Sequence, residues 1–156
     1  MKYYPITEHK NILETLIRQL RDLLNKIVNH ELKQYGITLK QLAVLDIVSI
    51  LGGKTSPKEL SMRLLRQPHT VSSLLIRMEQ QGLINRDTDP VKKVSVNITL
   101  TEKGEHILIE ARKLHALQDV TSCLSEQELQ QLTVSLKKLR DSAINKLAQI
   151  NSPFFT

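Results

Sequence analysis

The residues best suited to chemistry are five histidines and a single cysteine, and they are spread over the whole chain. An enzyme brings its acids, bases and nucleophiles together at one site. The sequence has no Gly-rich phosphate loop, no His-Glu-x-x-His motif and no Gly-x-Ser-x-Gly motif, each of which would place such groups at a fixed spacing. We therefore expect a protein that is not an enzyme and that needs no cofactor.

Metal binding and oxidation are the other chemistries that these residue types allow. His106 and Glu110 are one helical turn apart, and His30 and Glu31 lie near the end of a predicted helix. Such nitrogen and oxygen ligands suit zinc, but no Cys-rich or His-rich cluster accompanies them. Cys123 lies in a break between two predicted helices, where an incidental thiol is the favoured interpretation. Solvated surface positions are favoured for the other four residues, and we assign no metal site.

The composition predicts one helical protein with a positive charge. Its 156 residues include 22 Lys and Arg against 16 Asp and Glu, which gives a formal net charge of +6. Apolar residues make up 40% of the chain, enough to bury a core, whereas aromatic residues make up only 3%. Leu and Ile are abundant while Gly and Pro number five each, a balance that favours helices over a β-sandwich.

The sequence carries no signal for a membrane or for secretion. No apolar run approaches the ~18 residues that span a bilayer, and the first residues lack the apolar core of a signal peptide. One cysteine cannot form an internal disulfide, so nothing points to an oxidising compartment. We therefore expect a cytoplasmic protein without a membrane partner.

The positive charge is concentrated in the middle of the chain. Residues 54–95 hold eight basic side chains and four acidic ones, so this stretch carries +4 of the total of +6. A polyanion such as double-stranded DNA is the partner that this concentration of charge suits.

Hydrophobic spacing and capping signals predict the helices and strands that position these residues. Capping boxes are predicted at 38–41 and 125–128, and at 56–59 a serine cap is followed by a proline and by a glutamate that can reach back to the cap amide. Glycines just past helix ends mark further boundaries. The predicted helices cover residues 7–34, 38–51, 56–65, 68–81, 101–120 and 125–150. Alternating apolar and polar residues predict short strands at 83–86 and 94–100.

Two of the central helices, 56–65 and 68–81, are joined by a tight turn and form a candidate helix-turn-helix. A β-hairpin follows directly. We therefore predict a mainly α fold with a small β-hairpin wing (α+β), in which residues 37–100 form a winged helix-turn-helix DNA-binding domain. Residues 1–36 and 101–156 are expected to form a helical dimerisation region, because the apolar faces of the first and last helices are larger than one small domain needs.

Three stretches of the sequence together form a family pattern. They are Gly-Ile-Thr-Leu-Lys-Gln-Leu-Ala-Val-Leu at 36–45, Glu-Leu-Ser at 59–61 with Thr-Val-Ser at 70–72, and Met-Glu-Gln-Gln-Gly-Leu-Ile at 78–84 with Leu-Thr-Glu-Lys-Gly at 100–104. Their order and spacing resemble the MarR family of winged-helix transcription regulators. The resemblance implies a repressor that binds a near-palindromic operator as a homodimer and is released by a small organic effector. A winged-helix module for protein interactions and a metal-responsive regulator of the same family are the alternatives.

The predicted DNA contacts begin with the helix at 68–81. If Val71, Leu74 and Met78 face the core, the first turns of this helix project polar side chains outward. Amide, hydroxyl and guanidinium groups can read base edges or hold phosphates. These predicted contacts are Gln67, His69, Thr70, Ser72, Ser73 and Arg77. Lys54 and Lys58, near the start of the preceding helix, are predicted to contact backbone phosphates.

The wing and the recognition helix depart from the family pattern. MarR regulators usually carry an Asp-x-Arg signature in the wing, where this sequence has Lys92 and Lys93. Ser73 stands where the family commonly has a basic residue. A lysine serves as a point charge on phosphates, where a planar guanidinium fork is not needed. We therefore predict phosphate contacts rather than base-specific ones for Lys92 and Lys93.

The interior predicted from the sequence is aliphatic. Residues 36–153 contain no Phe, Tyr or Trp, and Tyr35 is the only one of these residues close to the predicted DNA-binding domain. A hydrophobic effector is compatible with such an interior, but a pocket with aromatic walls is not expected.

Overall fold

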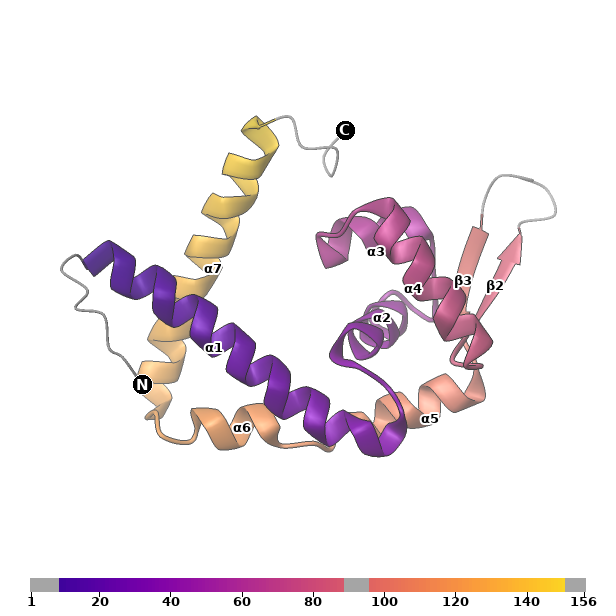
Figure 1. Cartoon of the computed structure of the whole chain (residues 1–156), viewed down its shortest axis with the longest axis horizontal. Helices are drawn as coiled ribbons and strands as arrows, with labels where there is room; N and C mark the ends of the chain where they lie inside the picture. Colours follow the sequence, from indigo (N-terminus) through magenta and orange to yellow (C-terminus); the bar gives the residue numbers. More distant parts are fainter. Residues whose placement is uncertain (1–8, 89–95, 151–156) are drawn as a thin grey trace.

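The computed structural model describes residues 9–88 and 96–150, and it shows a mainly helical chain with a small antiparallel sheet (Figure 1). The helices are α1 (His9–Leu32), the 3-10 helix η1 (Lys33–Tyr35), α2 (Leu39–Ile50), α3 (Pro57–Leu64), α4 (Pro68–Gln80), α5 (Glu102–Ala111), α6 (Ala116–Thr121) and α7 (Glu126–Gln149). The strands are β1 (Lys54–Thr55), β2 (Ile84–Thr88) and β3 (Val96–Leu100). The predicted fold class, a winged helix-turn-helix between flanking helices, is confirmed.

Local capping signals fix where the two helices of the helix-turn-helix begin. The Ser56 hydroxyl accepts a hydrogen bond from the Glu59 amide at 3.2 Å, and Pro57 occupies the first position of α3. Pro68 starts α4 in the same way. The return contact predicted from the Glu59 carboxylate to the cap is wrong, because this carboxylate pairs with Arg63 one turn later at 2.6 Å.

The turn between α3 and α4 contains a residue in the left-handed conformation. Leu65 follows α3 with a φ of 51°, and among the described residues it is the only non-glycine residue with a positive φ. The amides of Leu65 and Arg66 donate to the carbonyls of Met62 and Ser61 at 3.2 and 3.0 Å. Glycine usually ends a helix in this way, and leucine in this conformation costs about 1–2 kcal/mol.

The sheet has three strands in the order β1-β3-β2, where the sequence predicted a two-stranded hairpin. β1 pairs antiparallel with β3, so that Lys54 lies opposite Thr99, and β2 pairs antiparallel with the other edge of β3. Gly52 and Gly53, with φ values of 80° and 86°, lead the chain from α2 into β1. A two-residue strand is too short to show an alternating pattern, which is why the sequence does not predict β1.

One hydrophobic core joins the helix-turn-helix and the sheet to the ends of the flanking helices. α2 lies at its centre, with Val44, Leu45 and Val48 fully buried. The other side chains with almost no exposure are Leu32, Leu60, Val71, Leu75, Met78, Leu83, Ile84 and Ile98. Because burial of each such side chain contributes about 1.5–3 kcal/mol, this core holds α3 and α4 in place. We call α2–α5 together with β1–β3 the winged-helix body.

α5 begins so close to the end of α4 that a side chain would not fit between them. A Cβ atom on Gly104 would lie 2.1 Å from the backbone oxygen of Leu83. The Thr101 hydroxyl donates to the Gly82 carbonyl at 2.6 Å and accepts from the Gly104 amide at 3.0 Å. The Lys103 ammonium donates to the carbonyl of the α4 C-cap residue at 2.8 Å. These contacts explain the residue types at 101–104.

The single helix predicted over 101–120 is wrong, because the chain forms α5 and α6 there with a break between them. Just after α5, the Arg112 Nε and Nη2 atoms donate to Asp46 Oδ1 of α2 at 3.1 and 3.0 Å. α5 therefore packs against α2, whereas α6 packs against α1. No glycine or proline marks the break between the two helices in the sequence.

α7 and the start of α1 lie on one side of the molecule, away from the helix-turn-helix and the sheet, whereas the end of α1 reaches α2 (Figure 1). None of the 24 residues of α7, all of which the structure describes, is buried. We call α1 and α7 the arm helices, and their large exposed apolar side chains the arm surface. The arm surface consists of Leu13, Leu16, Ile17, Leu20, Leu23 and Ile27 on α1, and of Leu132, Val134, Leu136 and Leu139 on α7. Even these helices, like the others in the described ranges, are too short or too polar to span a bilayer.

Candidate nucleic-acid interface

α4 presents three strips of side chains, because residues three or four positions apart share one face of a helix. The first strip faces the core and consists of Val71, Leu75 and Met78. Opposite this strip are four exposed side chains, which we call the outer face of α4: His69, Ser73, Ile76 and Gln80. The third strip lines a groove between α4, α1 and α2, and it consists of Thr70, Leu74, Arg77 and Gln81.

The side chains predicted to contact DNA are divided among these strips. His69 and Ser73 lie on the outer face, whereas Thr70 and Arg77 are exposed on the groove side. Ser72 is exposed on the remaining flank of α4. The structure therefore brings only part of the predicted set onto one continuous face.

Leu74, which the sequence predicts to face the core, is only half-buried and lies in the wall of the groove. Its neighbour Leu75 is buried in the core. The flank on the far side of α4 is joined to the sheet by Glu79, which pairs with Arg86 of β2 at 3.4 Å.

The first of the predicted contacts on α4 is its N-cap residue, Gln67. Its side chain is half-buried and makes no capping bond. The Ser73 hydroxyl donates to the His69 carbonyl at 3.0 Å, and Arg77 Nε donates to the Ser73 carbonyl at 3.3 Å. These bonds to the helix backbone hold both side chains against α4. Together the residues offer amide, imidazole, hydroxyl and guanidinium groups, which can read base edges and hold phosphates.

The four predicted phosphate-binding lysines fall in three places. Lys54 is exposed in β1, and Lys58 is exposed in the first turn of α3. Lys92 and Lys93, at the expected tip of the wing, lie outside the described residues.

A groove of about 730 Å³ separates α4 from α1 and the start of α2. Three cationic side chains line it, Lys40, Arg66 and Arg77, and the described lining contains no acidic residue. The apolar part of its wall is aliphatic and consists of Leu39, Ala43, Leu64, Val71 and Leu74. Its volume lies within the usual range of sites for small organic molecules.

Amide side chains join the walls of this groove. Gln41 Nε2 donates to the side-chain oxygen of Gln81, which links α2 to the end of α4. The Gln41 side-chain oxygen also accepts from the Thr38 amide at 2.9 Å and completes the predicted capping box. Asn29 Oδ1 accepts from the Leu39 amide at 2.8 Å, so α1 is tied to the start of α2. The start of α2 is therefore joined both to α1 and to the end of α4.

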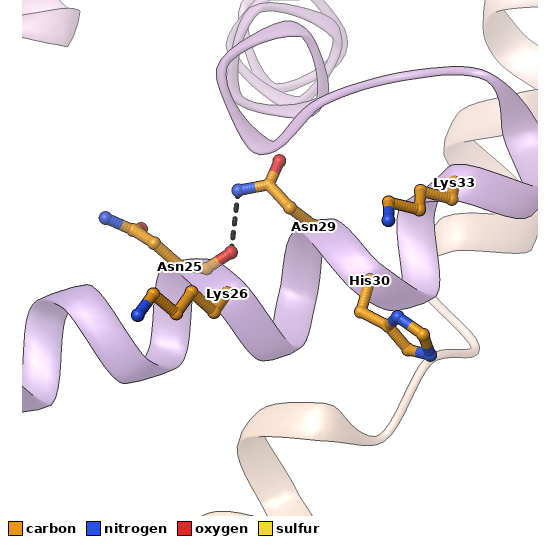
Figure 2. A pocket seen from close by; sticks show the side chains of 5 residues that line it. All are labelled: Asn25, Lys26, Asn29, His30 and Lys33. Carbon is orange, nitrogen blue, oxygen red and sulfur yellow. Dashed lines mark hydrogen bonds between the residues drawn. The ribbon is translucent and has the colours of Figure 1, made fainter.

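Figure 2 shows the face of α1 that adjoins the groove. The Asn29 amide donates to the Asn25 carbonyl at 2.6 Å, and both residues also line the groove. Lys26, His30 and Lys33 lie beside them on a shallow part of the surface. Lys26 and Lys33 add positive potential near the three cations of the groove.

Sequence comparisons decide between the families that share this architecture. The MarR family model matches residues 35–93. The HTH-type transcriptional regulator MgrA of Staphylococcus aureus is 35% identical over 114 residues, which cover 71% of this chain and 75% of that protein. The chain belongs to the MarR family.

This MarR-family protein is a DNA-binding transcriptional regulator and not an enzyme. The organohalide-sensing transcriptional regulator RdhR-CbdbA1625 in its ligand-free form superposes with a TM-score of 0.84 at 27% identity, over 92% of this chain and 86% of that chain. Its 2,4-dichlorophenol-bound form gives a TM-score of 0.84 at 28% identity, over 91% and 85% of the two chains. MepR of S. aureus in complex with DNA gives 0.77 at 27% identity, over 83% of this chain and 96% of that chain.

Three exposed residues of the candidate interface are not among the contacts predicted from the sequence: Arg66, Ile76 and Gln80. Arg66 directly precedes the predicted contact Gln67, so its charge in the turn was an available signal. Ile76 ends a run of three apolar residues, and such a run does not show which member faces outward.

The residues considered for metal binding do not form a ligand set in the described part of the chain. No group of three or more His, Cys, Asp or Glu residues there is placed to hold a metal ion. The Lys113 ammonium, which donates to the Glu110 carboxylate, lowers the pKa of Glu110, and nearby His106 lowers it further. The exposed Cys123 thiol donates to the Val120 carbonyl at 3.4 Å.

Proposed function

We propose that this MarR-family regulator is a repressor that binds a near-palindromic operator as a homodimer and is released by a small organic molecule. The outer face of α4 carries the proposal, because it is exposed and bears groups that can read bases. It belongs to residues 54–95, which carry +4 of the net charge of +6. The DNA complex of MepR supports this part of the proposal, since that regulator shares the fold.

In the proposed complex, α4 enters the major groove and residues 37–100 act as the DNA-binding domain. The residues proposed to meet base edges or nearby phosphates are Gln67, His69, Thr70, Ser72, Ser73 and Arg77. The residues proposed to hold the phosphate backbone are Lys54, Lys58, Lys92 and Lys93. Phosphate contacts of this kind position the protein, whereas base contacts specify the sequence.

The arm surface supports the homodimer. Apolar patches of this extent are rarely left open to water by soluble proteins, and they mark interaction surfaces. A second copy of the chain offers the same pair of apolar helices, so a two-fold interface would cover both at once. Residues 1–36 and 101–156 form the dimerisation region in this proposal. Two-fold symmetry then places the two α4 helices on half-sites about one helical turn apart.

The groove beside α4 supports release by a small molecule. An acidic group would meet Lys40, Arg66 and Arg77, while an apolar portion would meet the aliphatic wall. Thr70 and Arg77 belong both to this groove and to the proposed DNA contacts. A ligand that binds there would therefore favour arrangements of α4 other than the one that fits DNA. The dichlorophenol-bound form of RdhR-CbdbA1625 gives a first ligand to test.

A mobility-shift experiment on the DNA upstream of the regulator's own gene tests DNA binding. At low salt we expect a shift that unlabelled upstream DNA displaces and that unrelated DNA of equal length does not. Raising the salt concentration should weaken the shift, because each phosphate contact releases counterions when it forms. Equal competition by the unrelated DNA would contradict sequence-specific binding.

Titration calorimetry tests the groove with two probes, 2,4-dichlorophenol and octanoate, which share an acidic group on an apolar body. We expect at least one of them to bind and to release the protein from its DNA. Lys40→Gln, which removes a groove cation at the start of α2, should weaken ligand binding. Lys137→Gln on exposed α7 is the matched control. Equal ligand affinity in both variants would contradict binding in this groove.

A further inference from the structure

The outer face of α4 carries one residue that differs in kind from its neighbours. Ile76 is 42% exposed, and it lies on the same face as His69 and Ser73. Gln80, one turn further along, is also exposed. The side chains that attach α4 to the core lie on the opposite side of the helix. Ile76 is therefore a partly exposed apolar side chain within a polar surface, outside the strip that attaches α4 to the core.

An exposed isoleucine gains nothing from its contact with water, and it has no charge with which to attract a phosphate. Its branched side chain contributes favourable free energy only when another apolar group covers it and removes its surface from water. In the proposed DNA complex, the outer face of α4 is the part of the molecule that meets the floor of the major groove. An apolar group on that floor is therefore the partner that would cover Ile76.

The C5-methyl group of thymine is the apolar substituent that base pairs present in the major groove, beside their hydrogen-bond donors and acceptors. The helix axis rises about 4.5 Å from Ser73 to Ile76, which is close to the ~3.4 Å rise of one base pair. Ser73 and Ile76 can thus reach neighbouring base pairs of one half-site. We propose that Ile76 is a specificity-determining residue that contacts a thymine methyl group in each half-site. This inference rests on the proposed function, because it requires α4 to lie in the major groove.

The test removes the methyl group from the DNA and the side chain from the protein. The probe is the duplex that the full-length wild-type protein enriches from a random-sequence pool. Each thymine is replaced in turn, symmetrically in both half-sites, by deoxyuridine, which pairs identically but lacks the C5-methyl group. Fluorescence anisotropy then gives the affinity of the wild type and of Ile76→Ala for every duplex.

For the wild type, we expect one thymine position whose replacement weakens binding about fourfold per half-site and about fifteenfold for both half-sites together. For Ile76→Ala, the same replacement should change the affinity less than twofold, because the methyl group no longer has a partner. Ile76→Val keeps part of the hydrocarbon and should keep part of the effect. This second variant preserves the test if Ile76→Ala binds too weakly to measure.

The control is Ile50→Ala at the end of α2, which truncates another exposed isoleucine, 72% exposed, and should leave the deoxyuridine effect at its wild-type size. A deoxyuridine effect of equal size in the wild type and in Ile76→Ala would overturn the inference. So would a loss of affinity in Ile76→Ala with no methyl-sensitive thymine in the wild type, which would indicate a contact with the sugar backbone. Failure to enrich any duplex would instead contradict the proposed function itself.

Discussion

The winged-helix body and the arm helices are built from similar aliphatic residues, yet the body buries many of them. In the described part of the arm helices, only Leu32 at the end of α1 is buried. α2 is the centre of the body and hides Val44, Leu45 and Val48 completely. α7 is twice as long, with 24 residues against 12, and buries none of them. The body can therefore hold its shape with its own contacts, whereas the arm surface gains its full hydrophobic stabilisation only against another surface.

The largest effect on stability is expected when a side chain in the core of the winged-helix body is truncated. Leu45→Ala removes a fully buried side chain from α2 and should lower the free energy of unfolding by about 3 kcal/mol. Leu139→Ala makes the same truncation in α7, where the side chain is 47% exposed. Its cost should be less than about 1 kcal/mol in dilute protein and should grow with protein concentration.

Urea unfolding followed by circular dichroism, at two protein concentrations, measures both variants. Equal losses of stability for Leu45→Ala and Leu139→Ala would show that the body and the arm are not different in the way proposed. A loss for Leu139→Ala that does not depend on concentration would place Leu139 in contacts within one chain.

The next effect concerns the partner of the arm surface. Leu136→Glu puts a charge into the middle of this surface and should convert the proposed homodimer into a monomer at micromolar concentration. Operator affinity should then fall at least about 100-fold, because two linked half-site contacts become independent. Light scattering measures the molecular mass of the protein in solution, and fluorescence anisotropy measures its affinity for the operator. Asn145→Asp, which adds a negative charge at another exposed position of α7, should change neither.

A smaller effect distinguishes the cations of the body from those of the arm. Replacing Arg77 and Lys92 together by Gln should weaken operator binding roughly tenfold, and the slope of its salt dependence should fall by about one for each phosphate that the protein no longer binds. Arg140→Gln, which removes an exposed cation from α7, should leave the salt dependence unchanged. Anisotropy titrations at several salt concentrations measure the slope. The same slope in all three proteins would remove Arg77 and Lys92 from the phosphate contacts.

The smallest effect tests backbone strain within the body. Leu65→Gly should raise the free energy of unfolding by about 0.5–1 kcal/mol, because glycine adopts the positive φ of this turn without steric cost. Leu64→Gly, one residue earlier at the end of α3, should instead lower it by about 1 kcal/mol or more. Thermal unfolding measures both. A loss of stability in Leu65→Gly would show that the apolar contacts of Leu65 outweigh the strain.

Elements with strong local signals were predictable from the sequence. Pro57 and Pro68 mark the starts of α3 and α4, and the capping boxes at Thr38 and Ser125 are confirmed. In each case, the residues that decide the structure are neighbours in the chain, so local chemistry is sufficient. The order of these elements, with the residues at 36–45 and 100–104, also led to the correct family.

Features set by contacts between distant segments were not predictable. β1 forms because it pairs with the free edge of β3. The chain breaks after α5 because α5 packs against α2 whereas α6 packs against α1. On α4, the run of Leu74, Leu75 and Ile76 contains one half-buried, one buried and one exposed residue. Only the position of α4 on the body determines which is which. The orientation of the outer face is therefore a property of the tertiary structure.

The close approach at Gly104 has a consequence for the length of the operator. α5 is fastened to the end of α4 by backbone contacts, and Arg112 fastens its other end to α2. These contacts hold α4 and α5 together, so the two helices move as one unit. In the proposed homodimer, a change in the angle between the two protomers would therefore alter the distance between the two α4 helices. A displacement of one base-pair step, about 3.4 Å, would place the second helix out of register with its half-site. A stiff junction at this glycine would thus fix the number of base pairs between half-sites that one dimer accepts.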